Sequence, residues 1–198
     1  MKLGCLTAMF SDRSLKETLD ILRPLGLQAL ELGAGNWPGS AHLNVPELLA
    51  SSTKCDELKK MLKGEGLEIS ALSCHGNALH PDKAFAIKSI AAQTDAIKLA
   101  EKLGVKTVID FSGCPGSDDA STKPNWVTCA WPPDFLEVLE WQWDKKVIPY
   151  WQKQAKFAAE HGVRIAFEMH PGFVVYNTDA LLKLRNACGK NLGANFDP

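Results

Sequence analysis

The sequence has no stretch near the roughly 20 consecutive apolar residues that a membrane-spanning helix needs. Its first residues, Met1-Lys2-Leu3-Gly4-Cys5, run into mixed sequence with Asp12 and Arg13, which is unlike a signal peptide. It also lacks a strong charge of either sign, because 22 basic residues face 23 acidic ones and the net charge is −1. These absences predict a cytoplasmic protein with neither a membrane nor nucleic acid as its partner.

Paired cysteine motifs are also missing. No CxxC spacing occurs, so the sequence offers neither a redox pair nor a structural zinc knuckle. Scattered thiols of this kind are typical of a reducing compartment. The sequence therefore predicts six reduced cysteines: Cys5, Cys55, Cys74, Cys114, Cys129 and Cys188.

Short apolar runs alternate with longer segments of helical period. Strands are predicted at Leu3–Thr7, Leu27–Leu32, Leu67–Cys74, Lys106–Phe111, Val163–Met169 and Leu192–Phe196. Helices are predicted at Ser14–Arg23, Pro46–Lys63 with a break near Ser51–Lys54, Pro81–Leu103, Asp134–His161 interrupted at Pro149, and Asp179–Ala187. Ser14, with Glu17 three residues on, and Thr178 are the expected N-caps. The segment Ser112–Pro133, rich in Gly, Pro and Trp, is a loop long enough to be functional.

Strict alternation of strand and helix implies a parallel sheet. A doubly wound dinucleotide fold needs a glycine-rich turn after its first strand, and the sequence has Ala8-Met9-Phe10-Ser11-Asp12 there. The chain is therefore assigned to the α/β class as a (β/α)₈ TIM barrel, with about six of the eight β-α units present. Residues 1–198 are expected to form a single, incomplete domain.

Side chains alternate along a strand, so each strand has two phases. Val163, Ile165 and Phe167 make an apolar phase in the fifth strand, and Leu192, Ala194 and Phe196 make one in the sixth. The opposite phase is polar and lies mostly at carboxyl ends of strands: Glu31, His75, Asp110, Glu168, His170, Asn195 and Asp197. A doubly wound sheet needs apolar cover on both faces, whereas a barrel opens its active site at this end. The pattern favours the barrel.

Glu168 and Asp197 would repel each other in one barrel mouth unless a shared proton or a cation neutralises them. Carboxylate and imidazole ligands together suit Mn²⁺, Zn²⁺, Co²⁺ or Mg²⁺, and His170 shares a strand face with Glu168. A structural salt bridge is the alternative for the two carboxylates. His75 is either a satisfied buried histidine or a substrate contact. Trp126 either packs on the apolar face of a sugar or anchors its loop.

Several segments together resemble the sugar phosphate isomerase/epimerase family of xylose-isomerase-like TIM barrels. The resemblance runs along the whole chain. The segments that carry it are Ala29–Gly33, Leu72–Asn77 with His80-Pro81, Phe111–Gly116, Pro124–Thr128, Phe167–Gly172 and Asn195–Pro198.

This resemblance implies one divalent metal, with Mn²⁺ favoured, held by a Glu, an Asp, a His and a Glu at the ends of the fifth to eighth strands. Glu168 and Asp197 match the first two, and the other two have no counterpart in the sequence. The implied activity is isomerisation or epimerisation of a sugar or sugar phosphate through a metal-stabilised enediolate. Glu168 and His170 are then the expected catalytic residues. The expected substrate contacts are His75, Asn77, Trp126, Asn195 and Glu31.

Three alternatives stay open at this stage. A metal-dependent lyase acting on oxidised glycosides could use the same barrel. AP endonucleases also resemble the chain, but the region Phe111–Cys114 lacks their metal-binding histidine, which argues against a three-zinc cluster. A six-stranded barrel leaves two open edges, so the chain could be an inactive fragment or a non-catalytic subunit. The expected partner is a small-molecule carbohydrate, and formation of a homo-oligomer is left open.

Overall fold

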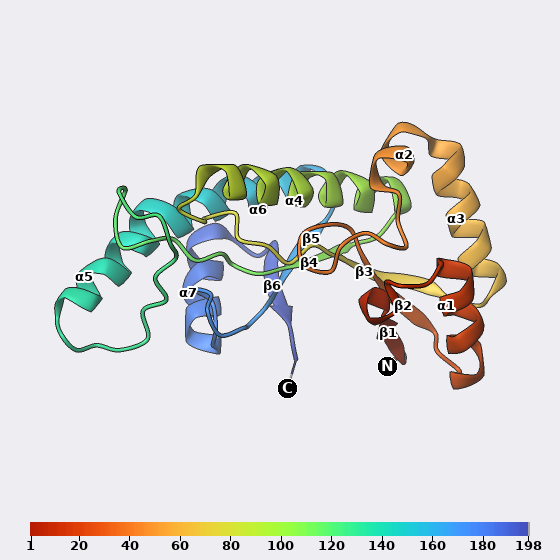
Figure 1. The fold of residues 1–198 in the computed structure, drawn as a ribbon, viewed down its shortest axis with the longest axis horizontal. Coiled ribbons are helices and arrows are strands. Elements are labelled where there is room, and N and C mark those ends of the chain that lie inside the picture. The colour runs from red at the N-terminus through yellow and green to blue at the C-terminus, as the bar shows by residue number, and fades with distance from the viewer. Residues whose placement is uncertain (198) are drawn as a thin grey trace. The chain divides into compact units, whose positions relative to one another are not determined.

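A computed structural model describes residues 1–197 (Figure 1). Pro198, which ends the Asn195–Pro198 segment, lies outside the described residues. The six strands follow the sheet order β1-β2-β3-β4-β5-β6 with helices between them, as the alternation predicts. The chain divides into two compact units. The first comprises Met1–His75, Ala92–Ile109 and His161–Val163, and the second Gly76–Ala91, Asp110–Glu160 and the residues from Arg164 onward.

Parallel strands form the core of the first unit. They are β1 (Gly4–Leu6), β2 (Ala29–Gly33), β3 (Glu68–Ser73) and the first part of β4 (Thr107–Asp110). The register pairs Cys5 with Leu30 and Leu72 with Val108. Between Leu30 and Glu31 the register against β3 shifts, which marks an irregularity of the bulge type. Leu30 and Leu72 are fully buried, so the apolar phase of these strands faces the core.

Three helices of the first unit lie where helices were predicted: α1 (Leu15–Leu22), α2 (Val45–Ala50) and α3 (Ser52–Gly64). Two short 3-10 helices, η1 (Thr7–Phe10) and η2 (Arg23–Leu25), were not predicted. Ser14 and Glu17 form the predicted capping box, and the hydrogen bonds from Ser14 hold the pKa of Glu17 below its usual range. The predicted break is also present, because Ser51 ends α2 and caps α3.

The second unit pairs β5 (Arg164–Glu168) with β6 (Leu192–Asn195) in parallel, from Ile165 opposite Leu192 to Glu168 opposite Asn195. Ile165 and Phe167 are buried, which confirms the predicted apolar phase of β5. The ring of Phe167 meets the buried indole of Trp151 edge-on, with 4.5 Å between centroids.

The apolar phase predicted for β6 is only partly correct. Leu192 is buried, but Ala194 is exposed and Phe196 is 76% exposed. In the part of the chain that the structure describes, no helix follows β6 to cover this face. Alternation alone therefore identified the face but not whether anything packs against it.

Two helices begin at polar caps. At the start of α4 (Lys83–Leu103), the backbone N–H groups of Phe85 and Ala84 donate to Asp82 and lower its pKa. For α7 (Thr178–Cys188) the predicted cap, Thr178, is wrong by one residue. Asn177 is the N-cap, and its side-chain oxygen accepts from the Ala180 N–H at 2.8 Å.

Among residues 1–197, no helix is long and apolar enough to cross a membrane.

The long helical segment of the second unit is continuous rather than broken. It consists of α5 (Asp134–Trp141), a π-helix η3 (Gln142–Val147) and α6 (Ile148–Glu160). The interruption predicted at Pro149 therefore takes the form of a π-helix just before that residue. Proline has no N–H for the carbonyl four residues back, and its ring collides with that carbonyl. A wider turn relieves this conflict without ending the helix.

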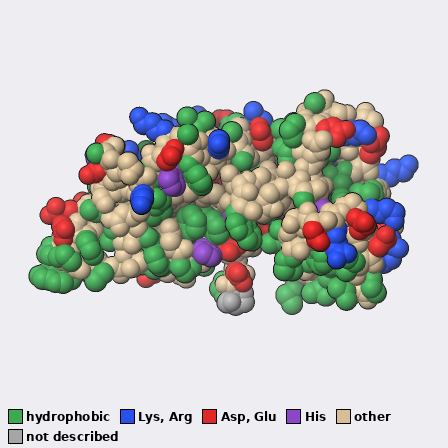
Figure 2. Space-filling model, viewed as in Figure 1, with side chains coloured by type: hydrophobic (Ala, Val, Ile, Leu, Met, Phe, Trp, Pro, Cys, Tyr) green, Lys and Arg blue, Asp and Glu red, His purple; other side chains and the backbone are tan. Residues whose placement is uncertain are grey.

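Apolar side chains gather around α5 on the surface of the second unit (Figure 2). None of the residues of α5 is buried. Trp131 in the preceding loop and Leu136 in the helix are the most exposed of these apolar side chains. The Ser112–Pro133 loop, here called the β4–α5 loop, therefore ends in an exposed helix, and its other contacts must hold it in place.

Ser112 connects the segments that follow β4 and β5. Its Oγ accepts the Val175 N–H at 2.8 Å, and its carbonyl accepts the indole N–H of Trp151 at 2.8 Å. The neighbouring Gly113 carbonyl accepts the Val174 N–H at 3.1 Å. These bonds fix the start of the β4–α5 loop against α6 and against the segment that leads into α7.

We predict that Ser112→Ala lowers the free energy of unfolding by about 1–3 kcal/mol, because a buried N–H loses its acceptor. Ser112 and Val175 are both 0% exposed, so water cannot replace the hydroxyl. Urea unfolding measures the change. The control is Ser52→Ala on the exposed face of α3, which should shift stability by less than about 0.5 kcal/mol. Equal stability of the Ser112→Ala variant and the wild type would contradict this role.

Candidate functional site

The carboxyl ends of β5 and β6 bring polar side chains to one edge of the second unit. Glu168 ends β5 and pairs in register with Asn195, which ends β6. Both side chains are half-buried, and Asp197 follows two residues later in an exposed position. Neighbouring strands lie about 4.8 Å apart, so a carboxylate and an amide stand side by side at this edge. The sequence predicted this adjacency from strand phase.

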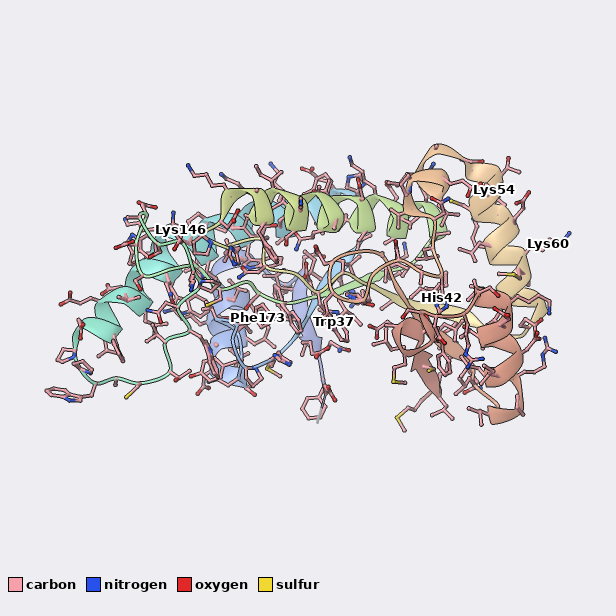
Figure 3. The ribbon with its side chains drawn as sticks, in the orientation of Figure 1. Trp37, His42, Lys54, Lys60, Lys146 and Phe173 are labelled. Carbon is pink, nitrogen blue, oxygen red and sulfur yellow. The ribbon has the colours of Figure 1, made fainter. Side chains whose placement is uncertain are left out.

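His170 follows β5 and is exposed. Its Nδ1 lies 2.7 Å from the Pro171 carbonyl oxygen, so Nδ1 carries the proton and donates it. In the neutral ring Nε2 is then the hydrogen-bond acceptor. The ring tilts against Phe111, 5.1 Å between centroids, and Phe111 stacks on Phe173 at 4.2 Å. An imidazole of defined tautomer thus lies on an aromatic surface that includes Phe173, which Figure 3 labels.

Trp126 lies in the β4–α5 loop and is 38% exposed. Its indole meets the ring of Tyr176 edge-on, with centroids 5.4 Å apart and planes at 90°. Two loops therefore contribute one aromatic pair, of which Trp126 is partly exposed. Nothing in the sequence had singled out Tyr176 or Phe173. The one available signal was the presence of three ring-bearing residues in the short segment after Glu168.

Asn77 is buried and bonded to the backbone of two loops. Its Oδ1 accepts from the Cys114 N–H at 2.9 Å and the Leu79 N–H at 3.1 Å, and its Nδ2 donates to the Cys114 carbonyl at 3.0 Å. These bonds join the loop after β3 to the loop after β4. They leave one Nδ2 hydrogen for the predicted substrate contact, which stays a prediction.

Asp110, the last residue of β4, is also buried. Its Oδ1 accepts the Phe111 N–H at 2.7 Å and the Gly76 N–H at 3.0 Å. The carboxylate therefore shapes the turn after His75 and the start of the β4–α5 loop.

In the same loop, burial raises the pKa of the Cys114 thiol to about 11, whereas Cys129 is exposed. All six cysteines are free.

The first unit contains the other two predicted substrate contacts, Glu31 and His75. Glu31 lies in β2 and is half-buried, and His75 is only 2% exposed. The Trp37 ring meets the His75 ring edge-on, with 6.0 Å between centroids, and the backbone N–H of Trp37 donates to the His75 carbonyl at 3.0 Å. Figure 3 labels Trp37 together with His42, which lies on the same loop. His42 reaches back to η1, where its Nδ1 lies 2.9 Å from the Thr7 hydroxyl.

The described residues include two of the predicted metal ligands, Glu168 and Asp197. Within residues 1–197 no group of three His, Cys, Asp or Glu side chains is close enough together to hold a metal ion. Glu168 and Asp197 offer two carboxylates from adjacent strand ends, which are hard oxygen donors suited to Mg²⁺ or Mn²⁺. The donor chemistry fits a divalent ion, but two ligands are fewer than such an ion needs.

A curated relative, the uncharacterized protein YfiH of Bacillus subtilis (strain 168), is 39% identical over 202 residues, covering 100% of this chain and 64% of YfiH. Three solved structures share the fold. The probable 3-DHS dehydratase AsbF of Bacillus anthracis, involved in petrobactin synthesis, gives a TM-score of 0.65 at 19% identity, covering 98% of this chain and 62% of AsbF. A D-tagatose 3-epimerase-like protein gives 0.64 at 17% identity, covering 98% and 64%. A xylose isomerase-like TIM barrel protein of Mycobacterium smegmatis, in complex with magnesium, gives 0.64 at 17% identity, covering 99% and 64%.

The chain thus spans somewhat less than two thirds of these relatives, between 62% and 64% of their lengths. Their shared architecture confirms the predicted α/β barrel class, seen here as six parallel strands with alternating helices. The family described as xylose isomerase-like TIM barrel matches residues 19–198. The chain belongs to the xylose isomerase-like TIM barrel family.

Proposed function

We propose that the chain carries one half of a divalent-metal site in an enzyme that isomerises or epimerises a sugar or sugar phosphate. The observation that carries this proposal is the β5–β6 register, which places Glu168 beside Asn195 with Asp197 two residues further on. The likeness to an epimerase-like protein and to a magnesium complex supports the enzyme class and the divalent ion. Mn²⁺ is the favoured ion, with Zn²⁺, Co²⁺ and Mg²⁺ as alternatives.

Glu168 and Asp197 would hold the ion through their carboxylates. When bound, a divalent cation supplies Lewis acidity toward a substrate carbonyl and the adjacent hydroxyl. A carboxylate oxygen of Glu168 that is not bound to the ion would take the proton on the carbon next to that carbonyl. The exposed Nε2 of His170 is the acceptor for a substrate hydroxyl, since Nδ1 donates to the Pro171 carbonyl. Asn195 orients a second hydroxyl through its side-chain amide.

Aromatic rings supply the apolar part of the substrate contact. The half-exposed Trp126 and the stacked pair Phe111–Phe173 offer faces on which the CH groups of a sugar can pack. For Glu31 and His75 of the first unit, the role of substrate contact stays a prediction. A small-molecule carbohydrate is thus the proposed partner and the cytoplasm the proposed location, with neither nucleic acid nor membrane involved and a homo-oligomer still open.

Elimination from an oxidised glycoside is the second candidate. It begins with the same proton loss from the carbon next to a carbonyl, and the likeness to a probable dehydratase supports it. Product analysis separates the two reactions, because isomerisation keeps every atom of the substrate in one product, whereas elimination breaks a C–O bond and releases the leaving group as a second product. An endonuclease is less well supported, because the balanced net charge of −1 offers no field for DNA.

We predict that Mn²⁺ binds weakly at the end of β5 and β6. Added in small amounts, the paramagnetic ion should broaden the amide NMR signals of Glu168, Asn195 and Asp197 before any others. Glu168→Gln should remove this selective broadening by replacing an anionic ligand with a neutral amide. Glu160→Gln is the matched control, because Glu160 is an exposed glutamate at the end of α6. Broadening centred elsewhere, or unchanged in Glu168→Gln, would refute the assignment.

A second prediction concerns the reaction itself. In D₂O with Mn²⁺, the active protein should incorporate deuterium next to the carbonyl of a ketohexose from a tested panel. Glu168→Gln should slow this exchange by about 10²-fold or more, because a general base is lost. NMR of the recovered sugar measures the label, and Glu160→Gln again serves as the control. Absence of exchange in the wild type with every sugar tested would favour the reading of the chain as an inactive fragment or subunit.

The third prediction uses two histidines of the second unit. His170 donates from Nδ1 to the Pro171 carbonyl, whereas Nδ1 of His80 accepts the Asp82 N–H at 2.9 Å. Neutral His170 should therefore carry its proton on Nδ1 and neutral His80 on Nε2. Long-range ¹⁵N–¹H NMR above the titration range distinguishes the two tautomers. An Nε2 proton on His170 would remove the hydroxyl acceptor from the proposed mechanism.

A further inference from the structure

The β4–α5 loop has one buried side chain at its centre that comes from outside the loop. Gln142, the first residue of the π-helix η3, is 0% exposed. Its Nε2 lies 2.7 Å from the Asn125 carbonyl oxygen, 2.9 Å from that of Gly116 and 3.4 Å from that of Pro115. The two N–H groups of its side chain therefore join the first part of the loop, at Gly116, to the later part, at Asn125.

The side-chain carbonyl of the same Gln142 amide forms no hydrogen bond with the described residues. The Oε1 of Gln142 is buried without a donor among the described residues. A buried acceptor left without a donor costs free energy, and an aliphatic side chain would avoid that cost. The benefit of a glutamine at this position must therefore lie in its N–H donors, and so in the loop that they hold.

The π-helix explains how Gln142 reaches the loop. Side chains five residues apart share a face in a π-turn, as those four residues apart do in an α-helix. Gln142 is thereby aligned with Val147 and, one α-helical turn further, with Trp151, and all three are buried. The wide turn imposed ahead of Pro149 thus puts Gln142 on the buried face of the helix.

Trp126 is the residue that this arrangement presents. It directly follows Asn125, whose N–H donates to the Pro115 carbonyl at 2.9 Å and whose carbonyl accepts from Gln142. Both hydrogen bonds fix the backbone immediately before the indole, which then meets Tyr176 edge-on. A shift of this backbone would carry the ring away from Tyr176.

We propose that Gln142 is a positioning residue that fixes the β4–α5 loop so that Trp126 faces the substrate. The inference rests on the proposed function only in giving Trp126 a sugar to contact. A second tie between η3 and the loop gives a useful comparison. The Nζ of Lys146, a residue labelled in Figure 3, lies 2.6 Å from Oδ1 of Asp119 and 5.1 Å from the centroid of the Trp141 ring. This ion pair is exposed and contributes little, so the buried amide dominates.

The experiment compares Gln142→Leu and the more adaptable Gln142→Met with two controls. Gln154→Leu removes another buried glutamine from the same helical segment, and Lys146→Ala removes the exposed tie. Amide hydrogen exchange should accelerate about tenfold or more at Asn125 in both Gln142 variants, since the carbonyl of Asn125 itself loses its donor. Exchange in β5 and β6 should stay unchanged, and both controls should leave Asn125 as in the wild type.

Two further readouts separate positioning from general stability. With 5-fluorotryptophan incorporated, the ¹⁹F signal of Trp126 should shift or broaden in the Gln142 variants, whereas that of Trp151 should not. On a ketohexose that the wild type converts, KM should rise several-fold with kcat within about twofold, as expected when ground-state and transition-state binding are lost alike.

Exchange at Asn125 that matches the Gln154→Leu control, or that accelerates equally through the whole second unit, would overturn the positioning role. The exchange and ¹⁹F readouts need no substrate. If no sugar is converted but Asn125 and Trp126 respond as expected, the proposed function fails and the loop assignment stands. If turnover persists with an unchanged KM and an unchanged loop, the loop assignment fails alone.

Discussion

Parallel pairing of β5 with β6 is the interaction from which the candidate site in the second unit follows. The same register that sets Glu168 beside Asn195 sends Ile165 and Phe167 to the buried face. Because side chains alternate along a strand, a slip of one residue would bury the carboxylate and expose the phenyl ring. The apolar core therefore specifies the polar edge, and neither can move without the other.

The loops around this edge are held by polar groups that are themselves buried. Asn77, Asp110, Ser112 and Gln142 each accept from or donate to main-chain groups of a neighbouring loop. Irregular backbone cannot satisfy its own hydrogen bonds, so side chains must do so wherever water is excluded. These four side chains satisfy main-chain hydrogen-bonding groups in the loops, as hydrogen bonds between neighbouring strands do in the sheet.

The strands, the helices and the strand phases could be predicted because apolar periodicity is local. The Ser14 capping box was equally readable, since its partner lies three residues away. Asn177 and Thr178 show the limit of this approach, because both residue types cap helices and the backbone conformation decides between them. For the same reason Phe196 could be assigned to a face but not to a burial state. The position of Trp126 depends on Gln142, and nothing local in the sequence connects those two residues.

The distribution of thiols has a practical consequence for studying the β4–α5 loop. Cys129 is exposed on this loop, whereas Cys55, Cys74 and Cys114 are buried, and burial raises the pKa of the Cys114 thiol to about 11. An accessible thiolate attacks electrophilic, thiol-reactive probes, so the loop carries a natural attachment point for a fluorophore or a spin label. A change in the surroundings of this loop can therefore be read as an optical or magnetic signal without introducing a new cysteine.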